Sequence, residues 1–356
     1  MKKRKILLIV FIILSIGLLM VYSSSHIWAQ YKENDSFYYF KRQAIFCNSR
    51  SSLLFFSKID YHFYQKHSLK IIILATILLV LVLIPGVGIV RGGSRSWFNL
   101  GLFALQPSEI YKIALIIYVS DYISHHYHQM KKLRYCLKPL IVMGIGFFLI
   151  MLQPDFGSGF VMCCSILLMI IITPFPFRYI IFLGLSGILM IILMIISAPY
   201  RMKRIFAFLD PFQDPLGSGF QMIQSLYAIG PGGILGSGFD QSIQKHFYLP
   251  EPQTDFIFAI YLEEFGFIGG ILLILLYAYL FITCFNYAKK VDDLFGSFLM
   301  IGMTSMIGIQ TIINLGVVVG LFPVTGVTLP LMSYGGTSLL VTLIEIGIMY
   351  NIIKSI

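Results

Sequence analysis

The stretch "FIFAIYLEEFGFIGGILLILLYAYLFITCF", residues 256–285, decides the fold because its apolar run is longer than a lipid bilayer requires. About 20 predominantly apolar residues suffice for a helix to cross the hydrocarbon core. The whole chain has this character: 58% of its 356 residues are hydrophobic, only 12% are charged, and the mean hydropathy is +0.85. A soluble domain carries about 25% charged residues. The composition therefore predicts an all-α polytopic membrane protein, since a spanning helix satisfies its own backbone hydrogen bonds.

Apolar runs of spanning length recur along the chain. The clear ones lie near residues 6–24, 69–90, 106–124, 139–153, 158–174, 179–198, 256–285, 297–321 and 337–353. Another, near 43–57, is more polar and carries Arg50, which costs roughly 2.5–3.5 kcal/mol at the centre of a spanning helix. We keep it as a span held by its neighbours, because without it the lysines flanking the first two segments do not all fall on one side. The sequence predicts about ten transmembrane helices in a single integral-membrane domain, residues 1–356.

The basic residues give these helices an orientation. With the N-terminus and the C-terminus both cytoplasmic, 15 of the 26 Lys and Arg residues fall in short inner segments. Short cytoplasmic loops carry an excess of Lys and Arg, so this orientation is the expected one. The net charge of +10 is thus a topology signal, and we expect membrane lipid and no nucleic acid as the surroundings of the protein.

One long segment between spans, residues 199–255, falls on the outer side. It is rich in turn-forming residues, as in "DPFQDPLGSGFQ" (210–221) and "GPGGILGSGFD" (230–240), which favour loop over helix. A structureless loop of this length is usually functional. The sequence therefore predicts one large extracytoplasmic loop that carries function.

Three of the charged residues inside predicted spans are candidates for function or lack an evident partner. Glu109 and Lys112 lie three residues apart on one helix face, after Ser108 as the expected N-cap. They form either a self-neutralising pair on one helix or part of a polar cluster facing a water-filled cavity. We favour the cluster, which is the default for charges inside a membrane. Glu345 is a lone acid in the last span, and the sequence names no partner for it.

Basic residues also gather just outside the predicted spans. Arg201 and Arg204 lie in "APYRMKRI" (198–205), and Arg95 and Trp97 lie in "RGGSRSWFNLG". Such cations commonly meet lipid headgroups, and Trp commonly marks the interfacial belt. Arginines beside Gly-rich backbone also suit a lipid-linked phosphate, because a guanidinium group binds phosphate oxygens in bidentate fashion. Both interpretations remain open.

Asp255 stands directly before the apolar run quoted first, at the end of the long loop. In "LPEPQTDFIF" (249–258) two prolines stiffen the segment, and Glu251 lies four residues before Asp255. One hypothesis is an acidic N-cap on a helix starting at Phe256, worth about 1 kcal/mol. The other is a general base at the boundary of water and lipid, where partial burial raises the pKa of a carboxyl toward a working value. The residues alone leave the two near parity.

Long motifs in fixed order resemble those of the SEDS family (shape, elongation, division and sporulation). They are "GGSRSWFNLGLFALQPSEIYK", "QPDFGSG", "APYRMKRIFAFLDPFQDPLGSGFQMIQSLYAIGPGGILGSG", "YLPEPQTDFIFAIYLEEFGFIGG" and "PVTGVTLPLMSYGGTS". The resemblance covers nearly the whole chain, and "MVYSSSHIWAQYKENDSFYYFKRQ" is most similar to the FtsW branch and its sporulation members. Two features depart from the family pattern: the polar second span, and Phe212 where the family usually has Trp.

The resemblance implies a ten-helix peptidoglycan glycosyltransferase acting on lipid II at the outer face of the bacterial cytoplasmic membrane, for septal or spore-cortex wall. It implies a class B penicillin-binding protein as the transpeptidase partner. It places the family's catalytic aspartate on Asp255, as general base or as ligand of a divalent cation, Mg²⁺ or Mn²⁺. The substrate-binding residues expected from the matched motifs are Trp97, Arg95, Glu109, Lys112, Arg201, Arg204, Gln224 and Ser225.

The chemistry of such a reaction explains these residue types. A sugar hydroxyl is a poor nucleophile near neutral pH, so a positioned carboxylate helps by taking its proton. The departing diphosphate needs positive charge. Two other functions stay open: a lipid II flippase, since intramembrane charges also suit a transporter, and a non-catalytic scaffold that activates a penicillin-binding protein and does not need Asp255.

The topology can be tested with single cysteines in a cysteine-free background. We expect a membrane-impermeant thiol reagent to label Ser218→Cys on intact cells and to leave Gln129→Cys unlabelled, because the basic residues place residues 199–255 outside and 125–138 inside. The measurement is the labelled fraction before and after lysis. Labelling of Gln129→Cys alone would invert the orientation.

Overall fold

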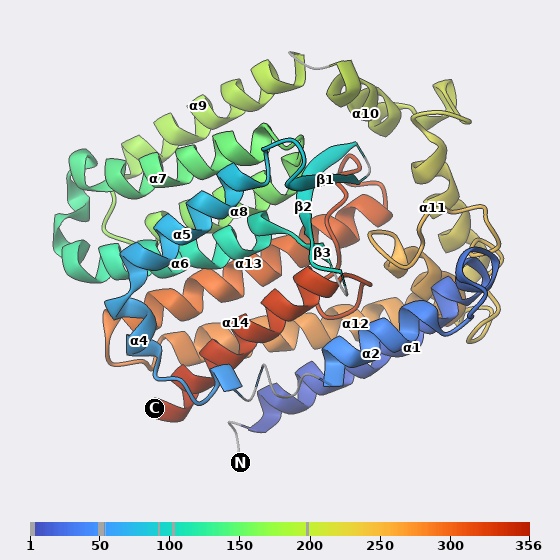
Figure 1. The fold of residues 1–356 in the computed structure, drawn as a ribbon, viewed down its shortest axis with the longest axis horizontal. Helices are drawn as coiled ribbons and strands as arrows, with labels where there is room; N and C mark the ends of the chain where they lie inside the picture. The colour runs from blue at the N-terminus through green and yellow to red at the C-terminus, as the bar shows by residue number, and fades with distance from the viewer. Residues whose placement is uncertain (1–3, 49–52, 54, 92, 102–103, 197–198) are drawn as a thin grey trace.

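The apolar runs of the sequence form a helical bundle (Figure 1). The computed structural model describes residues 4–356 apart from 49–52, 54, 92, 102–103 and 197–198. Its longer helices are α1 (Arg4–Glu33), α2 (Tyr38–Asn48), α5 (Ser68–Leu81), α6 (Pro107–His126), α7 (Leu133–Met151), α8 (Phe156–Ile171), α9 (Phe177–Ile196), α10 (Pro199–Leu209), α11 (Phe220–Gly232), α12 (Ile257–Ala288), α13 (Leu294–Val318) and α14 (Gly336–Ser355). Short helices are α4 (Tyr61–Lys66), η1 (Tyr127–Lys131) and η2 (Pro211–Gln213).

Several of these helices are long and apolar enough to cross a membrane. By length and composition the described residues contain five, within α1, α7, α12, α13 and α14, and shorter apolar helices in α5, α8 and the first part of α9. Helix α6 coincides with the expected span at 106–124 and carries the predicted charges. The doubtful second span near 43–57 begins in α2, but Arg50 and its neighbours lie outside the described residues.

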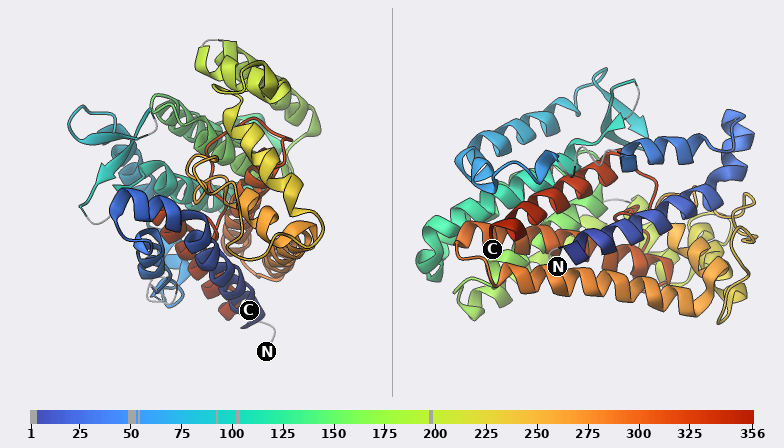
Figure 2. Two further views of the ribbon diagram at one scale, coloured as in Figure 1. Left: turned by 90° about the vertical axis from the view of Figure 1, so that its right-hand side faces the viewer. Right: turned by 90° about the horizontal axis from the view of Figure 1, so that it is seen from below.

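Helices α6 and α13 form the centre of the bundle. Helix α13 packs against α6, α8 and α12, and α6 packs against α5 and α13. Both present buried residues on almost every face. Both chain ends lie toward one end of the bundle, and the segment between α10 and α12 lies toward the other (Figures 1 and 2). An even number of membrane crossings produces this arrangement.

A small antiparallel sheet, which the sequence analysis did not predict, follows α5. Its strands are β1 (Gly88–Arg91), β2 (Ser94–Asn99) and β3 (Ala104–Leu105), in the order β1-β2-β3. The hydroxyls of Ser94 and Ser96 on β2 both donate to the Gln153 carbonyl, between α7 and α8. The sheet is thereby fixed to the end of the bundle.

The long loop, residues 199–255, was predicted to be structureless, and this prediction was wrong because the loop contains α10 and α11. The Gly- and Pro-rich stretches do form turns, as expected, on either side of α11. Helix α10 is amphipathic, with Arg201, Lys203 and Arg204 among its apolar residues. Helices of this kind lie along a membrane interface.

Helix α12 breaks its regular geometry at Gly266, where φ is 65° and ψ is −166°. This backbone region is essentially restricted to glycine. The break lets residues 233–238 of the long loop, here named the kink-bound segment, bond to the helix backbone. The bonds run from Ser237 N to Glu263 O (2.9 Å), from Gly238 N to Glu264 O (3.0 Å), from Phe267 N to Gly233 O (2.9 Å) and from Ile268 N to Ile234 O (3.1 Å).

Gly266→Ala should therefore lower the thermal unfolding midpoint. A Cβ atom at Gly266 would lie 2.3 Å from Gly236 N, and the backbone conformation itself costs about 1–3 kcal/mol for a residue other than glycine. The control is Gly144→Ala in α7, where a Cβ meets nothing within 4 Å and alanine favours the helix by roughly 1 kcal/mol. Equal midpoints for the two variants would contradict the role given to the kink.

Candidate active site

Asp255 lies at the junction of the long loop and α12, just outside the spanning helix. Helix α12 begins at Ile257, and its N-cap position belongs to Phe256, which makes no side-chain cap. The Asp255 carboxylate instead accepts a hydrogen bond from Thr254 Oγ1 at 2.9 Å. The structure therefore does not support the capping hypothesis, and the carboxylate has no structural duty to the helix.

Hydrogen bonds from other parts of the chain hold the backbone around Asp255. Asn314 of α13 donates through Nδ2 to the Asp255 carbonyl (2.7 Å) and to the Val327 carbonyl (2.8 Å). The Tyr334 amide donates to the Gln253 carbonyl at 2.8 Å. The segment before α12 and the segment between α13 and α14 are thus fastened to each other through backbone carbonyls, and the Asp255 carboxylate takes no part in these bonds.

Burial raises the pKa of Asp255, and the nearby charge of Glu251 raises it further. The hydrogen bond from Thr254 and the positive charge of Arg204 act in the opposite direction. A raised pKa makes the carboxylate a stronger base, which is the property that general base catalysis requires.

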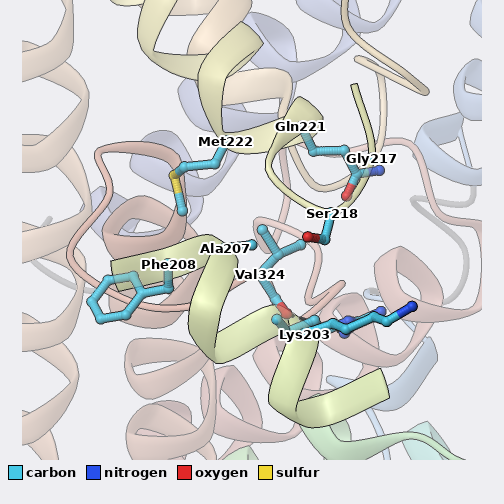
Figure 3. A pocket seen from close by; sticks show the side chains of 9 residues that line it. Lys203, Ala207, Phe208, Gly217, Ser218, Gln221, Met222 and Val324 are labelled. Carbon is cyan, nitrogen blue, oxygen red and sulfur yellow. Dashed lines mark hydrogen bonds between the residues drawn. The ribbon is translucent and has the colours of Figure 1, made fainter. Parts of the chain in front are cut away.

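A cavity of 280 Å³ lies between α10 and the start of α11. Its lining residues are Lys203, Arg204, Ala207, Phe208, Gly217, Ser218, Gln221, Met222 and Val324. Figure 3 shows Val324 between Lys203 of α10 and Gln221 of α11. The Arg204 guanidinium donates to the Val324 carbonyl at 3.0 Å. The cavity thus has two cations and apolar walls, which suits a lipid-linked anion.

Helix α11 places the other two predicted residues of the long loop beside this cavity rather than in its lining. Gln224 is half-buried, and Ser225 is fully buried. The Ser225 hydroxyl donates to the Val318 carbonyl at 2.8 Å. Ser225 therefore fastens α11 to the end of α13 in this structure, and Arg201 lies half-buried on α10.

Arg95 and Trp97 lie on β2, where the pairing with β1 shifts register: Arg95 opposes Val90 and Trp97 opposes Ile89. Both are half-buried. The Arg95 guanidinium reaches the Leu83 carbonyl at 3.5 Å, and its buried Nε has no hydrogen-bond partner. Strand β2 thus carries a partly satisfied guanidinium and an indole two residues apart.

Glu109 and Lys112 form a buried ion pair on α6. Their charged atoms are 2.7 Å apart, and the side chains are 8% and 2% exposed. Lys112 also donates to Gln310 Oε1 of α13 at 3.3 Å. Glu345 of α14, for which the sequence named no partner, interacts electrostatically with both charges. The pair predicted on one helix is therefore the centre of a polar cluster built by three helices.

Ser108 does not cap this helix, so that expectation was wrong. Gln106 holds the N-cap position and Pro107 opens α6, which leaves Ser108 inside the first turn. Proline is favoured at the first helical position because it has no N–H to satisfy there.

Lys112→Met should destabilise the protein by about 3–5 kcal/mol, the cost of removing one partner from a buried ion pair. The reason is that Glu109 and Glu345 then share a buried site without a cation. Adding Glu109→Gln should restore much of the loss, because it removes one of the two uncompensated acids. Thermal unfolding in one detergent measures both variants, and equal midpoints would contradict the pairing.

Sequence reasoning missed a second buried charged cluster. Lys245 of the long loop forms ion pairs with Asp240 and with Glu264 of α12. The motif containing "EEFG" was quoted as part of the resemblance, yet neither acid was assigned a role. Only the spacing of two acids inside an apolar run could have drawn attention to them.

The residues near Asp255 fit a divalent cation only if the protein shares the ion with the substrate's phosphates. Within the described ranges, no three His, Cys, Asp or Glu side chains gather as a metal site. Asp255 offers one carboxylate, with Glu251 close enough to influence it. Mg²⁺ is commonly held by one or two carboxylates together with substrate phosphates. The donor set therefore fits a cation that arrives with a diphosphate.

These features define a helical, multi-pass membrane protein with a carboxylate and a cationic cavity at one end of its bundle. Residues 3–356 match the sequence model of the FtsW, RodA and SpoVE family, described as "Cell cycle protein". The chain belongs to this family.

Named relatives agree with this assignment. Stage V sporulation protein E of Bacillus subtilis (strain 168) is 48% identical over 349 residues, 98% of this chain and 95% of the relative. The probable peptidoglycan glycosyltransferase FtsW of Trichlorobacter lovleyi is 40% identical over 350 residues, 98% of this chain and 92% of the relative.

Solved structures share the fold. A chain from work on "Structural coordination of polymerization and crosslinking by a peptidoglycan synthase complex" superposes with a TM-score of 0.81 and 28% identity, covering 99% of this chain and 97% of that one. The rod shape determining protein RodA of Thermus thermophilus superposes with a TM-score of 0.71 and 24% identity, covering 99% and 96%. The mostly helical membrane fold predicted from the sequence is confirmed.

Proposed function

We propose that this protein is a peptidoglycan glycosyltransferase that polymerises lipid II at the outer face of the bacterial cytoplasmic membrane, with Asp255 as the general base. The observation that carries the proposal is the Asp255 carboxylate itself. It lies at the end of the long loop and makes no helix cap. Its pKa is raised, and it interacts electrostatically with Arg204, which lines the neighbouring cavity. The names of the FtsW relatives and of the peptidoglycan synthase complex support the same activity.

In the proposed step the C4 hydroxyl of an acceptor GlcNAc attacks C1 of a MurNAc residue on lipid II. Asp255 accepts the hydroxyl proton as the new C–O bond forms. The bond from C1 to the diphosphate oxygen breaks, and undecaprenyl diphosphate leaves with the electron pair. Binding energy from the lipid tail and sugars holds the two reacting atoms together, which supplies much of the rate enhancement.

The leaving diphosphate requires positive charge at the other end of the reaction. Arg204 and Lys203 line the cavity, and Arg201 lies on the same helix. We assign these cations to the diphosphate, with Arg95 and Trp97 of β2 as further contacts to the substrate. In the alternative in which Asp255 binds a divalent cation that arrives with the diphosphate, that ion would supply additional charge neutralisation at the leaving group.

We also propose a class B penicillin-binding protein as the partner that crosslinks the product. Support comes from the synthase complex, whose description joins polymerisation with crosslinking. Both termini lie in the cytoplasm in this proposal, and the distribution of basic residues supports this orientation. Similarity to the stage V sporulation protein E makes sporulation one setting for the activity, and the FtsW relatives make division another.

Asp255→Asn should reduce the rate of glycan polymerisation at least ~100-fold, the low end for losing acid–base help. The amide preserves size and hydrogen bonding but does not accept a proton at neutral pH. The measurement is glycan chain formation from labelled lipid II by the purified protein with its partner. Preparations are matched for amount and thermal stability.

The matched control is Asp292→Asn, an exposed acid in the turn between α12 and α13, at the opposite end of α12 from Asp255. It should leave the rate within about twofold, since a surface substitution away from the site changes little. Near-wild-type polymer from Asp255→Asn would refute the catalytic role. Transport of lipid II without polymer, by the wild-type protein, would favour a flippase instead.

A further inference from the structure

Lys245 is buried where the long loop meets α1 and α12. Its side chain is 1% exposed, and its ammonium pairs with Asp240 and with Glu264, the latter at 3.3 Å. It also donates to Ser23 Oγ of α1 at 3.3 Å, and Ser23 in turn donates to Glu264 at 2.5 Å. Three parts of the chain that are distant in sequence therefore meet at one buried cation.

The carboxylate of Glu263, the neighbour of Glu264 on α12, binds the same part of the loop at residues 242–244. It accepts from the Ile243 amide (2.7 Å), the Ser242 hydroxyl (2.5 Å) and the Gln244 amide (3.4 Å). A buried carboxylate with several such donors is satisfied without a cation. The charge of Lys245 is therefore directed to Glu264 and Asp240.

The segment that starts at this anchor ends at Asp255. Residues 240–255 contain no helix or strand, and only scattered turn hydrogen bonds, such as Leu249 N to Gln244 O at 3.0 Å, act within the segment. The far end is held by the bonds of Asn314 and Tyr334 described above. Between the anchors Leu249 is fully buried. The position of the Asp255 carboxylate thus depends on what secures both ends of the segment.

We infer that Lys245 is a positioning residue: by joining the 240–255 segment to Glu264 of α12, it sets where the Asp255 carboxylate stands. This inference rests on the proposed function, in which Asp255 takes the proton of the acceptor hydroxyl. A displacement of about 1 Å between a catalytic group and its target costs on the order of 100-fold in rate. Loss of the anchor should therefore slow turnover while leaving the cationic cavity, which lies on α10 and α11, able to bind lipid II.

The test is Lys245→Met in the full-length protein, which keeps the length of the side chain and removes its charge. We expect kcat for polymerisation of labelled lipid II to fall ~10- to 100-fold. The lipid II concentration at half-maximal rate should stay within about twofold, because the binding contacts are elsewhere. Hydrogen exchange should become faster in residues 240–255 and stay unchanged in α13.

A double variant, Lys245→Met with Glu264→Gln, separates positioning from plain stability. It removes the unpaired acid that the single variant leaves buried, so the unfolding midpoint should recover. The anchor is still absent, so kcat should remain low. A residue that acted only on stability would regain activity together with the midpoint.

The control is Lys41→Met, which removes an ion pair to Asp35 at 2.8 Å on a side chain that is 63% exposed. Exposed pairs contribute little, so its kcat and exchange should match the wild type. Asp255→Asn is measured in parallel. Its activity would overturn the proposed function whatever Lys245→Met does.

Two outcomes overturn the positioning role while the proposed function stands. One is a wild-type kcat for Lys245→Met with an inactive Asp255→Asn. The other is recovery of kcat along with the unfolding midpoint in the double variant.

Discussion

The break in α12 at Gly266 is the constraint on which the rest of the structure depends. A regular helix uses its own carbonyls four residues along and leaves none for other segments. At the break the carbonyls of Glu263 and Glu264 instead accept amides of the kink-bound segment. The loop is thereby tied to the same turns of α12 that carry the two anchoring carboxylates. Asp255 lies two residues before the start of α12, so this local irregularity connects the spanning helix to the loop that ends at Asp255.

Two buried cations organise the polar interior, and each has more than one acidic neighbour. Lys112 lies among Glu109 and Glu345, and Lys245 lies between Asp240 and Glu264. A charge in contact with lipid would be costly, and these side chains are surrounded by protein from several helices. Desolvation offsets most of the attraction inside such a cluster, whereas removing one partner leaves a buried charge without compensation.

Much of the fold followed from the sequence, because hydrophobic length is a local property. The run at 256–285 became α12. The sequence did not predict contacts between residues that are distant along the chain. The partner of Glu264 is on a loop and on α1, and Ser23 is 241 residues away in sequence. The sheet was missed because its strands are short, and β2 is held by serine contacts to Gln153 rather than by an alternating apolar pattern.

The roles of the site residues stay predictions. The sequence named Asp255 and the arginines of α10, and the structure adds that the Asp255 carboxylate does not cap α12. The structure also shows that the Ser225 hydroxyl bonds to the end of α13, a contact that no motif could indicate. Residue type predicts which chemistry is available, and tertiary contacts decide which groups are already engaged.

The electrostatics of Asp255 fit a base that strengthens when substrate binds. Burial raises its pKa while the charge of Arg204 opposes the rise. In the proposed complex a diphosphate occupies the cavity that Arg204 lines, and its negative charge offsets the guanidinium. The opposing effect on Asp255 then weakens, and the pKa of the carboxyl rises further. In the proposed complex the carboxyl therefore has a greater affinity for the acceptor's proton than it has in the empty site. Binding of the leaving group by the same cations thus strengthens the base in this proposal.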